Sequence, residues 1–324
     1  MKSVWIHATV ACAALTLPAP QVAAQTYPSK PIRMLLPYPA GGPNDIFARV
    51  IAQKLSEAFG KQVVIDNRGG AGGVIGTEIA ARATADGHTL LFGGAASLAT
   101  APALQTNLPY DPLKDFAPVC LVAIAPLMLV THPSLPVKSA QDLIALAKAK
   151  PGQLNYASGG IGGLSHLAGE LFKSMGAVEI VHVPFSGGGP STIATVAGQV
   201  QMFFAGMASA LPLVKESKLK GLGITSAQRS AAAPEWPTLA ESGVPGYEIV
   251  TWFAVVAPAA TPKSVIARLN AEIVKAVAAA DTRKRFLDLA TDPASSTPEE
   301  LGAYNRRELA KWKKIVNSAG IKSE

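Results

Sequence analysis

Residues 154–175 read LNYASGGIGGLSHLAGELFKSM and contain the three parts that decide the fold. Leu154–Ala157 is a short run bounded by turn residues, which predicts a strand. Ser158–Gly163 is rich in glycine and predicts a loop. Leu164–Met175 carries apolar residues at helical spacing, which predicts a helix. A strand, a glycine-rich loop and a helix in this order are typical of an α/β fold.

The same order recurs elsewhere in the chain. Glycine-rich loops follow predicted strands at Gly41-Gly42, at Gly69–Gly73 and at Gly187–Gly189. Because strands alternate with helices, we expect parallel sheets. In such sheets these loops lie at the carboxyl ends of the strands, where ligands bind. Each loop exposes backbone N–H groups beside a helix N-terminus, so it is suited to an anion and especially to a carboxylate.

Two of these loops precede residue 120 and two follow it, which predicts two lobes that offer two loops each to one cleft. The length of 324 residues agrees, since domains average about 150 residues. A composition of 49% hydrophobic and 16% charged residues rules out a disordered chain, and two Cys rule out a disulfide scaffold. The net charge of +7 suits an anionic ligand, but the basic residues are spread along the chain.

The first 24 residues have the layout of a secretory signal. Lys2 is followed by the apolar run Ala8–Leu17, and the small residues Val22-Ala23-Ala24 precede Gln25. The run is much shorter than the roughly 20 residues that a membrane-spanning helix needs. We therefore expect export and cleavage near Ala24. Cleavage would lower the net charge from +7 to +6 and leave Cys120 as a single, buried thiol.

Motifs for nucleotide phosphates and the Gly-x-Ser-x-Gly nucleophile elbow are absent from the sequence. No His has the spacing of a metal ligand relative to another His, Cys or acidic residue. No basic stripe is interleaved with aromatic residues, so we expect no nucleic-acid partner. Ser158 and His166 are close in sequence and Asp45 could join them in space, so a Ser-His-Asp hydrolase stays an alternative.

Three polar residues near the loops have two interpretations each. Asp45, at the entry to a predicted helix, either contacts a ligand or caps backbone N–H groups. Arg68 either pairs with a ligand carboxylate or forms an ion pair with its neighbour Asp66. His166 either contacts a ligand or supports the glycine loop before it.

The second half of the chain carries further signals. Val119–Thr131 predicts a strand region that is broken at Pro126. Ser139 is a candidate N-cap with an acidic residue three positions on. Thr261 and Thr297 are each followed by Pro, which predicts an N-cap with Pro at the first helical position.

Several longer motifs follow one another along the chain: Tyr27–Arg33, Pro37–Asp45, Asp66–Gly73, Ala85–Leu91, Leu108–Pro112, Asn155–His166, His182–Phe185, Gly243–Tyr247 and Ser296–Glu300. In this order they resemble the solute-binding proteins of tripartite tricarboxylate transporters, also called the Bug family. The resemblance covers nearly the whole chain after the signal segment.

The resemblance implies an α/β, two-lobed periplasmic binding protein fold of the type II kind, with the ligand cleft between the lobes and no catalysis. On this basis residues 25–120 and 226–324 would form lobe 1, and residues 121–225 lobe 2. The ligand loops of the family correspond to four segments of this chain, and the predicted ligand contacts are Tyr38, Ala40, Gly42, Asn44, Asp45, Ala71, Gly72, Ser97, Ser158, Gly159, Gly162, His166, Ser186, Gly187 and Ala205.

The chain departs from the family pattern at positions that bear on the ligand. Gly159 and Gly163 stand where many members have Ser or Thr, and Ala205 stands where many have Asp. An Asp there would suit an ammonium group, so its absence disfavours amino acids. Phe185 and Phe203 could add an apolar wall, which leaves aromatic and longer-chain carboxylates beside citrate-like ones.

The sequence thus predicts a periplasmic receptor that captures a dicarboxylate, tricarboxylate or aromatic carboxylate and delivers it to two membrane subunits of a tripartite transporter. We expect a monomer without metal or cofactor. A secreted hydrolase that uses Ser158 and His166, and a binding protein that serves a sensor kinase, are the alternatives.

Overall fold

A computed structural model describes residues 27–105, 107–318 and 320. The predicted signal segment, residues 1–24, lies outside the described residues. The strands are β1 Ile32–Leu36, β2 Val63–Asn67, β3 Thr89–Gly94, β4 Phe116–Thr131, β5 Leu154–Ser158, β6 Ile180–Pro184, β7 Met202–Gly206, β8 Lys220–Ile224, β9 Val250–Pro258 and β10 Asp292–Pro293. The helices are α1 Pro43–Phe59, α2 Val74–Ala81, α3 Ala101–Leu104, α4 Ala140–Ala149, α5 Leu164–Gly176, α6 Gly188–Val196, α7 Met207–Lys215, α8 Lys263–Ala278, α9 Ala280–Leu287 and α10 Pro298–Ser318, with helical turns η1 Ala71–Gly73 and η2 Ala96–Thr100.

The strands form two mixed sheets that are joined through β4. Their order is β2-β1-β3-β9-β4-β7-β5-β6, and β8 and β10 also pair with β4. β1 is parallel to β2 and β3, and β5 is parallel to β6 and β7. β9 is antiparallel to β3 and to β4. We call the part built on β1, β2, β3 and β9 lobe 1, and the part built on β5–β8 lobe 2.

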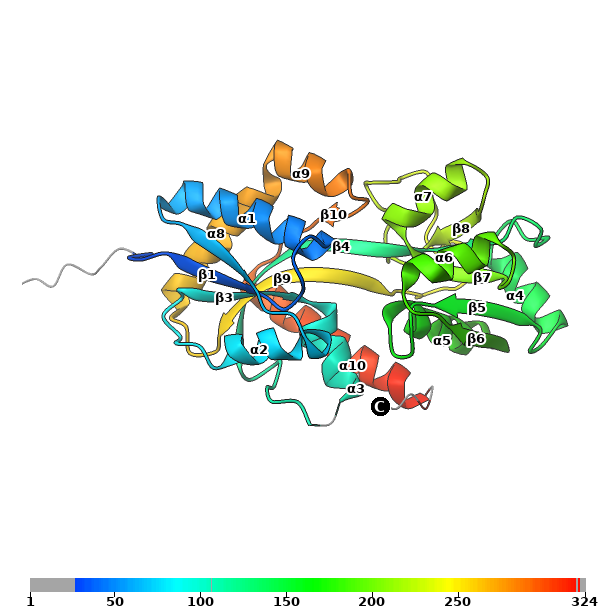
Figure 1. Ribbon diagram of the computed structural model, residues 1–324, viewed down its shortest axis with the longest axis horizontal. Helices are drawn as coiled ribbons and strands as arrows, with labels where there is room; N and C mark the ends of the chain where they lie inside the picture. Colours follow the sequence, from blue (N-terminus) through cyan, green and yellow to red (C-terminus); the bar gives the residue numbers. More distant parts are fainter. Residues whose placement is uncertain (1–26, 106, 319, 321–324) are drawn as a thin grey trace, which may run out of the picture.

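β4 runs through both lobes (Figure 1). It pairs with β9 up to Pro126 and with β7 from Leu127 onward. The expected break at Pro126 is therefore wrong. Pro126 forms the last pair of the ladder with β9, opposite Val250, so its missing N–H falls where that ladder ends. The lobe bounds at residues 120 and 225 stay a prediction.

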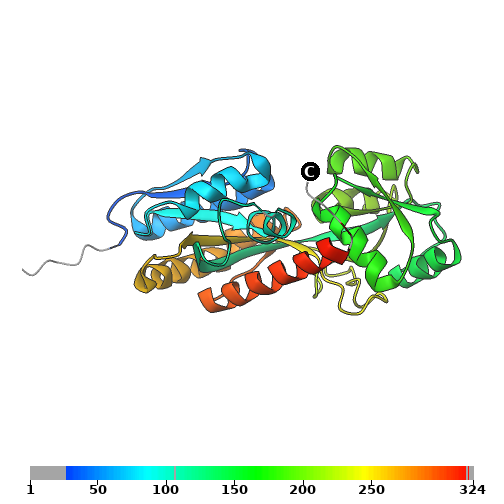
Figure 2. The same ribbon diagram turned by 90° about the horizontal axis from the view of Figure 1, so that it is seen from below.

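The sheet of lobe 1 is mixed rather than parallel as expected, because β9 runs antiparallel to β3, and it is buried on both faces. Because side chains alternate along a strand, Met34 and Leu36 pack in one core cluster and Leu35 packs in another. Helices α1 and α8 cover the first face, and α2 and α10 cover the second. The carboxyl-terminal end of α10 reaches α5 of lobe 2 (Figure 2). None of the helices in the described ranges combines the length and the apolar character that crossing a membrane takes.

The predicted helix caps have different outcomes. Ser139 caps α4 by accepting from the N–H of Asp142, as expected. Thr297 accepts from the N–H of Glu300, whose carboxylate accepts from the N–H of Thr297, so a capping box starts α10. The cap predicted at Thr261 is wrong, because its hydroxyl donates to the Pro258 carbonyl and Pro262 precedes α8.

Thr297→Ala should lower the free energy of unfolding by about 1 kcal/mol, because it removes one partner of the capping box. Urea unfolding monitored by circular dichroism measures this. Thr192→Ala, the same substitution within α6, is the control and should change stability by less than about 0.5 kcal/mol. Equal effects of the two substitutions would contradict the assigned cap.

Candidate ligand-binding site

Five helices follow the carboxyl end of a strand and begin at a glycine. The N-caps of α1, α2, α5, α6 and α7 are Gly42, Gly73, Gly163, Gly187 and Gly206, and none of them has a side-chain cap. In Figure 1 the amino end of α1 points toward lobe 2 and the carboxyl end of β5 points toward lobe 1. The uncapped N–H groups, which carry the positive ends of the helix dipoles, therefore gather on the sides of the lobes that are turned toward each other.

In lobe 1 the structure brings the loops after β1 and β2 together. The side-chain amide of Asn67 donates to the Tyr38 carbonyl at 3.1 Å. A Cβ on Gly73 would lie 3.3 Å from the Pro37 carbonyl oxygen, and its φ of 99° favours glycine, so a side chain here would crowd and strain the loops. Burial raises the pKa of Tyr38, and its ring lies 3.5 Å from where a Cβ on Gly73 would be. The turn η1 contacts η2, which contains Ser97. Tyr38, Ser97 and the Ala71–Gly73 turn thus form one region.

Asp45 is buried and holds the loop after β1 in place. Its carboxylate accepts from the Gly41 N–H at 3.1 Å, from Arg49 Nε at 2.8 Å and from Asn67 Nδ2 at 3.1 Å. The hydrogen bond from Arg49 holds the pKa of Asp45 below its ordinary value. The helix N-cap itself is Gly42, so Asp45 ties the loop to α1 and β2 without capping the helix.

Arg68 is half of an ion pair. Its Nε donates to Asp66 at 2.9 Å, and Arg33 Nε donates to the other carboxylate oxygen of Asp66 at 2.7 Å. Burial acts to raise the pKa of Asp66, but the hydrogen bonds from Arg33 and Arg68 outweigh it and the pKa is lowered. Of the two interpretations of Arg68, the structure shows the ion pair.

In lobe 2 the loops after β5 and β6 touch. A Cβ on Gly159 would lie 3.2 Å from the backbone of Gly187 and Gly188, so a Ser or Thr at position 159 would crowd the neighbouring loop. Most N–H groups of the loop after β5 have partners within the loop or in the first turn of α5. Gly159 N–H donates to Ser165 Oγ at 3.0 Å, and Gly162 N–H donates to His166 Nδ1 at 3.0 Å.

His166 is buried beneath this loop and stacks on His182. Their ring centroids lie 3.9 Å apart and the rings are nearly parallel, at 9°. His182 Nε2 lies 2.5 Å from Ser158 Oγ. Burial lowers the pKa of His166. Burial, together with the neighbouring His166, lowers the pKa of His182 to about 4. Of its two interpretations, His166 has a loop-supporting contact, and its contact with a ligand stays a prediction.

The arrangement does not match a hydrolase that uses Ser158 and His166. Ser158 is fully buried, and its hydroxyl contacts His182 rather than His166. Asp45 is occupied by Arg49 and Asn67 in lobe 1. Within the described residues, no three or more His, Cys, Asp or Glu side chains are placed to hold a metal ion.

The remaining predicted contacts differ in exposure. Ala40, Ala71, Gly72, Gly159 and Ser186 are exposed, Gly42, Asn44, Gly162 and Gly187 are half-buried, and Ala205 is fully buried in β7. The loop after β5 comes close to helix α3 of lobe 1. A Cβ on Gly162 would lie 3.3 Å from the Leu104 side chain. The ligand role of each of these residues stays a prediction.

Two residues of this region, Ser165 and His182, were not among the predicted contacts. His182 is the first residue of the motif His182–Phe185, which the sequence predicts to lie at the end of a strand. Its hydrogen-bond partner Ser158 lies on a different strand, β5. Only the parallel register, which sets Tyr156 opposite His182, brings them together.

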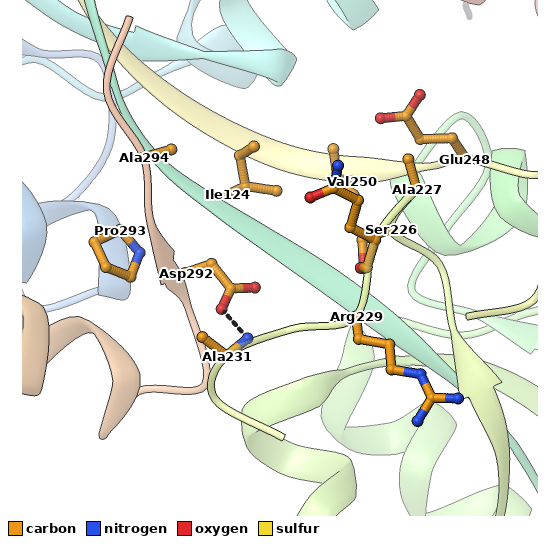
Figure 3. A pocket seen from close by; sticks show the side chains of 11 residues that line it. Ile124, Ser226, Ala227, Arg229, Ala231, Glu248, Val250, Asp292, Pro293 and Ala294 are labelled. Atoms are coloured by element: carbon orange, nitrogen blue, oxygen red, sulfur yellow. Dashed lines mark hydrogen bonds between the residues drawn. The ribbon is translucent and has the colours of Figure 1, made fainter. Parts of the chain in front are cut away.

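A cavity of about 360 Å³ lies apart from these loops (Figure 3). Residues of β4, β9 and β10 and of the segment after β8 line it, including Ile124, Val250 and Asp292. Two of its charged groups have partners: Asp292 accepts from the Ala231 N–H at 2.7 Å, and Arg229 pairs with Glu241. None of its lining residues is a predicted ligand contact, and its chemistry does not favour it over the glycine loops.

The comparisons with known proteins agree with the two-lobed architecture. The model of the tripartite tricarboxylate transporter family receptor matches residues 47–321. The chain belongs to this receptor family. The resemblance inferred from the motifs is thus confirmed, and with it the two-lobed α/β fold of periplasmic binding proteins. Members of this family are solute-binding receptors and not enzymes, so the hydrolase alternative is wrong.

Individual relatives are similar over most of their length. Protein BugT of Bordetella pertussis is 38% identical over 94% of this chain and 94% of its own. The structure of R. palustris Rpa4515 with adipate is 34% identical, with a TM-score of 0.75 over 91% of this chain and 99% of its own. MatC from Rhodopseudomonas palustris with bound malate is 32% identical, with a TM-score of 0.69 over 90% of this chain and all of its own.

Acidification should destabilise the receptor through His182. Its pKa is about 4 in the folded chain and near 6.5 in an unfolded one. Below about pH 6.5 the unfolded chain therefore takes up a proton that the folded chain resists, and stability falls until about pH 4. Urea unfolding at pH 7.5, 6.0 and 4.5 measures this loss. His182→Gln should lose less stability over the same range, and parallel curves for the two proteins would refute the assignment.

Proposed function

We propose that this receptor binds a small carboxylate between its lobes in the periplasm and delivers it to two membrane subunits of a tripartite transporter. The observation that carries the proposal is the set of uncapped glycine N-termini. Each of them offers N–H donors and a favourable dipole to an anion without a charged side chain. Closure of the lobes would follow from tighter binding of the ligand to the closed arrangement.

Free donors support the proposed contacts. Among the described residues, the N–H groups of Gly42, Ala71, Gly72 and Gly187 donate to no protein group. They come from three different loops in two lobes. A carboxylate has two oxygens that accept up to four hydrogen bonds, so one such group could be met from both lobes at once.

The proposed ligand class is a dicarboxylate with an apolar middle. Structures of relatives contain adipate and malate. Ala205 offers no charge to a ligand ammonium group. Ile161, at the tip of the loop after β5, is 60% exposed, and its neighbour Gly162 adjoins Leu104 of lobe 1. This side chain could pack on a methylene chain when the lobes close.

A thermal-shift panel tests the proposed function. Adipate, malate and citrate are compared with adipamide, which has the same chain as adipate but no charge. A ligand that binds only the folded state stabilises it by about 2.7 kcal/mol at 100 times its Kd. At least one dicarboxylate should raise Tm while adipamide does not. A panel without any shift, or an equal shift with adipamide, would overturn the proposal.

Ile161→Asn should weaken adipate binding more than malate binding. Each methylene that leaves water contributes about 0.8 kcal/mol, so the ratio of the two Kd values should change about three- to tenfold. Isothermal titration calorimetry measures both constants. Val181→Asn is the control, since Val181 is also exposed in lobe 2 but lies near the amino end of β6. An unchanged ratio in Ile161→Asn would exclude the contact.

A further inference from the structure

Three aromatic rings form a column beneath the loop after β5. Tyr156 stacks on His182 at 5.0 Å, and His182 stacks on His166 at 3.9 Å. They come from β5, β6 and α5, so the column joins three elements of lobe 2. Its far end is fixed, because Tyr156 donates its hydroxyl proton to Glu170 at 2.6 Å and Glu170 is paired with Lys173.

Each histidine holds a different part of the loop. His166 Nδ1 accepts from the Gly162 N–H, so this ring is neutral and its proton is on Nε2. Ser158 Oγ accepts from the Gly160 N–H at 3.2 Å and donates to the Gly160 carbonyl at 3.1 Å. The third partner of the Ser158 hydroxyl is His182 Nε2, which donates to or accepts from it according to the tautomer of the ring. The Ser158 hydroxyl is thus held by both His182 and the Gly160 backbone.

The loop needs such support because its backbone is unusual. Gly160 and Gly162 have φ values of 132° and 74°, in the region that favours glycine. A glycine-rich segment loses much conformational entropy when it is fixed, so contacts that fix it in advance reduce the loss on ligand binding. The two histidine contacts lie on either side of Ile161, the exposed tip.

We propose that His166 and His182 are positioning residues for the ligand. They set the shape of the 158–163 loop through the Gly162 N–H and the Ser158 hydroxyl, and thereby raise affinity through the loop. This inference rests on the proposed function, since it assigns the loop a part in carboxylate binding.

The contact of His166 depends on its protonation. A proton on Nδ1 would face the Gly162 N–H and remove the acceptor. The charged and titratable groups around the pair are Glu170 and Lys173 from α5 and Tyr156 from β5. Glu170 favours a charged ring, whereas burial and Lys173 oppose it. Affinity should therefore hold at neutral pH and decline in acid.

A crossed pair of substitutions tests the proposal. The side-chain oxygen of Asn matches the position of His Nδ1, and the terminal amide of Gln matches that of His Nε2. His166→Asn and His182→Gln should thus keep adipate and malate affinity within about threefold. His166→Gln and His182→Asn should each lose about tenfold, the effect of one hydrogen bond. His132→Asn and His132→Gln, outside the loop in lobe 2, are controls that should change nothing.

The outcomes separate this inference from the proposed function. If the unmodified protein binds neither dicarboxylate, the proposed function fails, and amide exchange of Gly162 in ligand-free protein then tests the inference alone. Exchange should be faster in His166→Gln than in His166→Asn. Equal affinity in all four variants, equal losses in both members of a pair, or equal exchange would overturn it. At pH 5, His166→Asn should keep a larger share of its neutral-pH affinity than the unmodified protein, because Asn does not titrate.

Discussion

Backbone N–H groups without a protein partner are costly to bury, and five helices of this receptor begin with such groups. A serine or threonine N-cap would satisfy them, as Ser139 and Thr297 do for α4 and α10. Glycine at the five sites instead leaves the donors to water. They must stay at the edge of a lobe until an acceptor replaces that water. A two-lobed chain whose loops face each other meets this requirement, because its loops stay accessible to water or to an anion.

This constraint explains the use of charge near the loops of lobe 1. Asp45 pairs with Arg49, and Asp66 lies between Arg33 and Arg68. These side chains satisfy one another and fix the loops after β1 and β2. An unpaired Arg there would bind an anion strongly, but burying it would cost its desolvation. The N-termini of helices supply positive potential through backbone N–H groups that the helix already holds in place. The protein therefore has to rearrange little when an anion binds.

The parts of the fold that could be predicted are those set by local chemistry. Strand, glycine loop and helix follow from the residues of each segment, and the capping box at Thr297 follows from Thr297 and Glu300 alone. Helix α7 escaped prediction because Pro212 interrupts its pattern. The continuity of β4 through Pro126 depends on a change of partner from β9 to β7, which only the tertiary structure contains. The contact of Ser158 with His182 likewise depends on the register of β5 against β6.

The same register makes the two loops of lobe 2 behave as one unit. Gly159 packs closely against Gly187 and Gly188. A Cβ at position 159 would lie only 3.2 Å from their backbone atoms. The backbone of Phe185 donates to the Ser158 carbonyl, and the His182 side chain reaches the Ser158 hydroxyl. Glycine at position 159 thus allows close contact between the two loops. The donors that these loops offer are therefore backbone N–H groups held by contacts between the loops. A rigid set favours a ligand whose carboxylates fit its spacing, because the loop has little freedom to adapt to others.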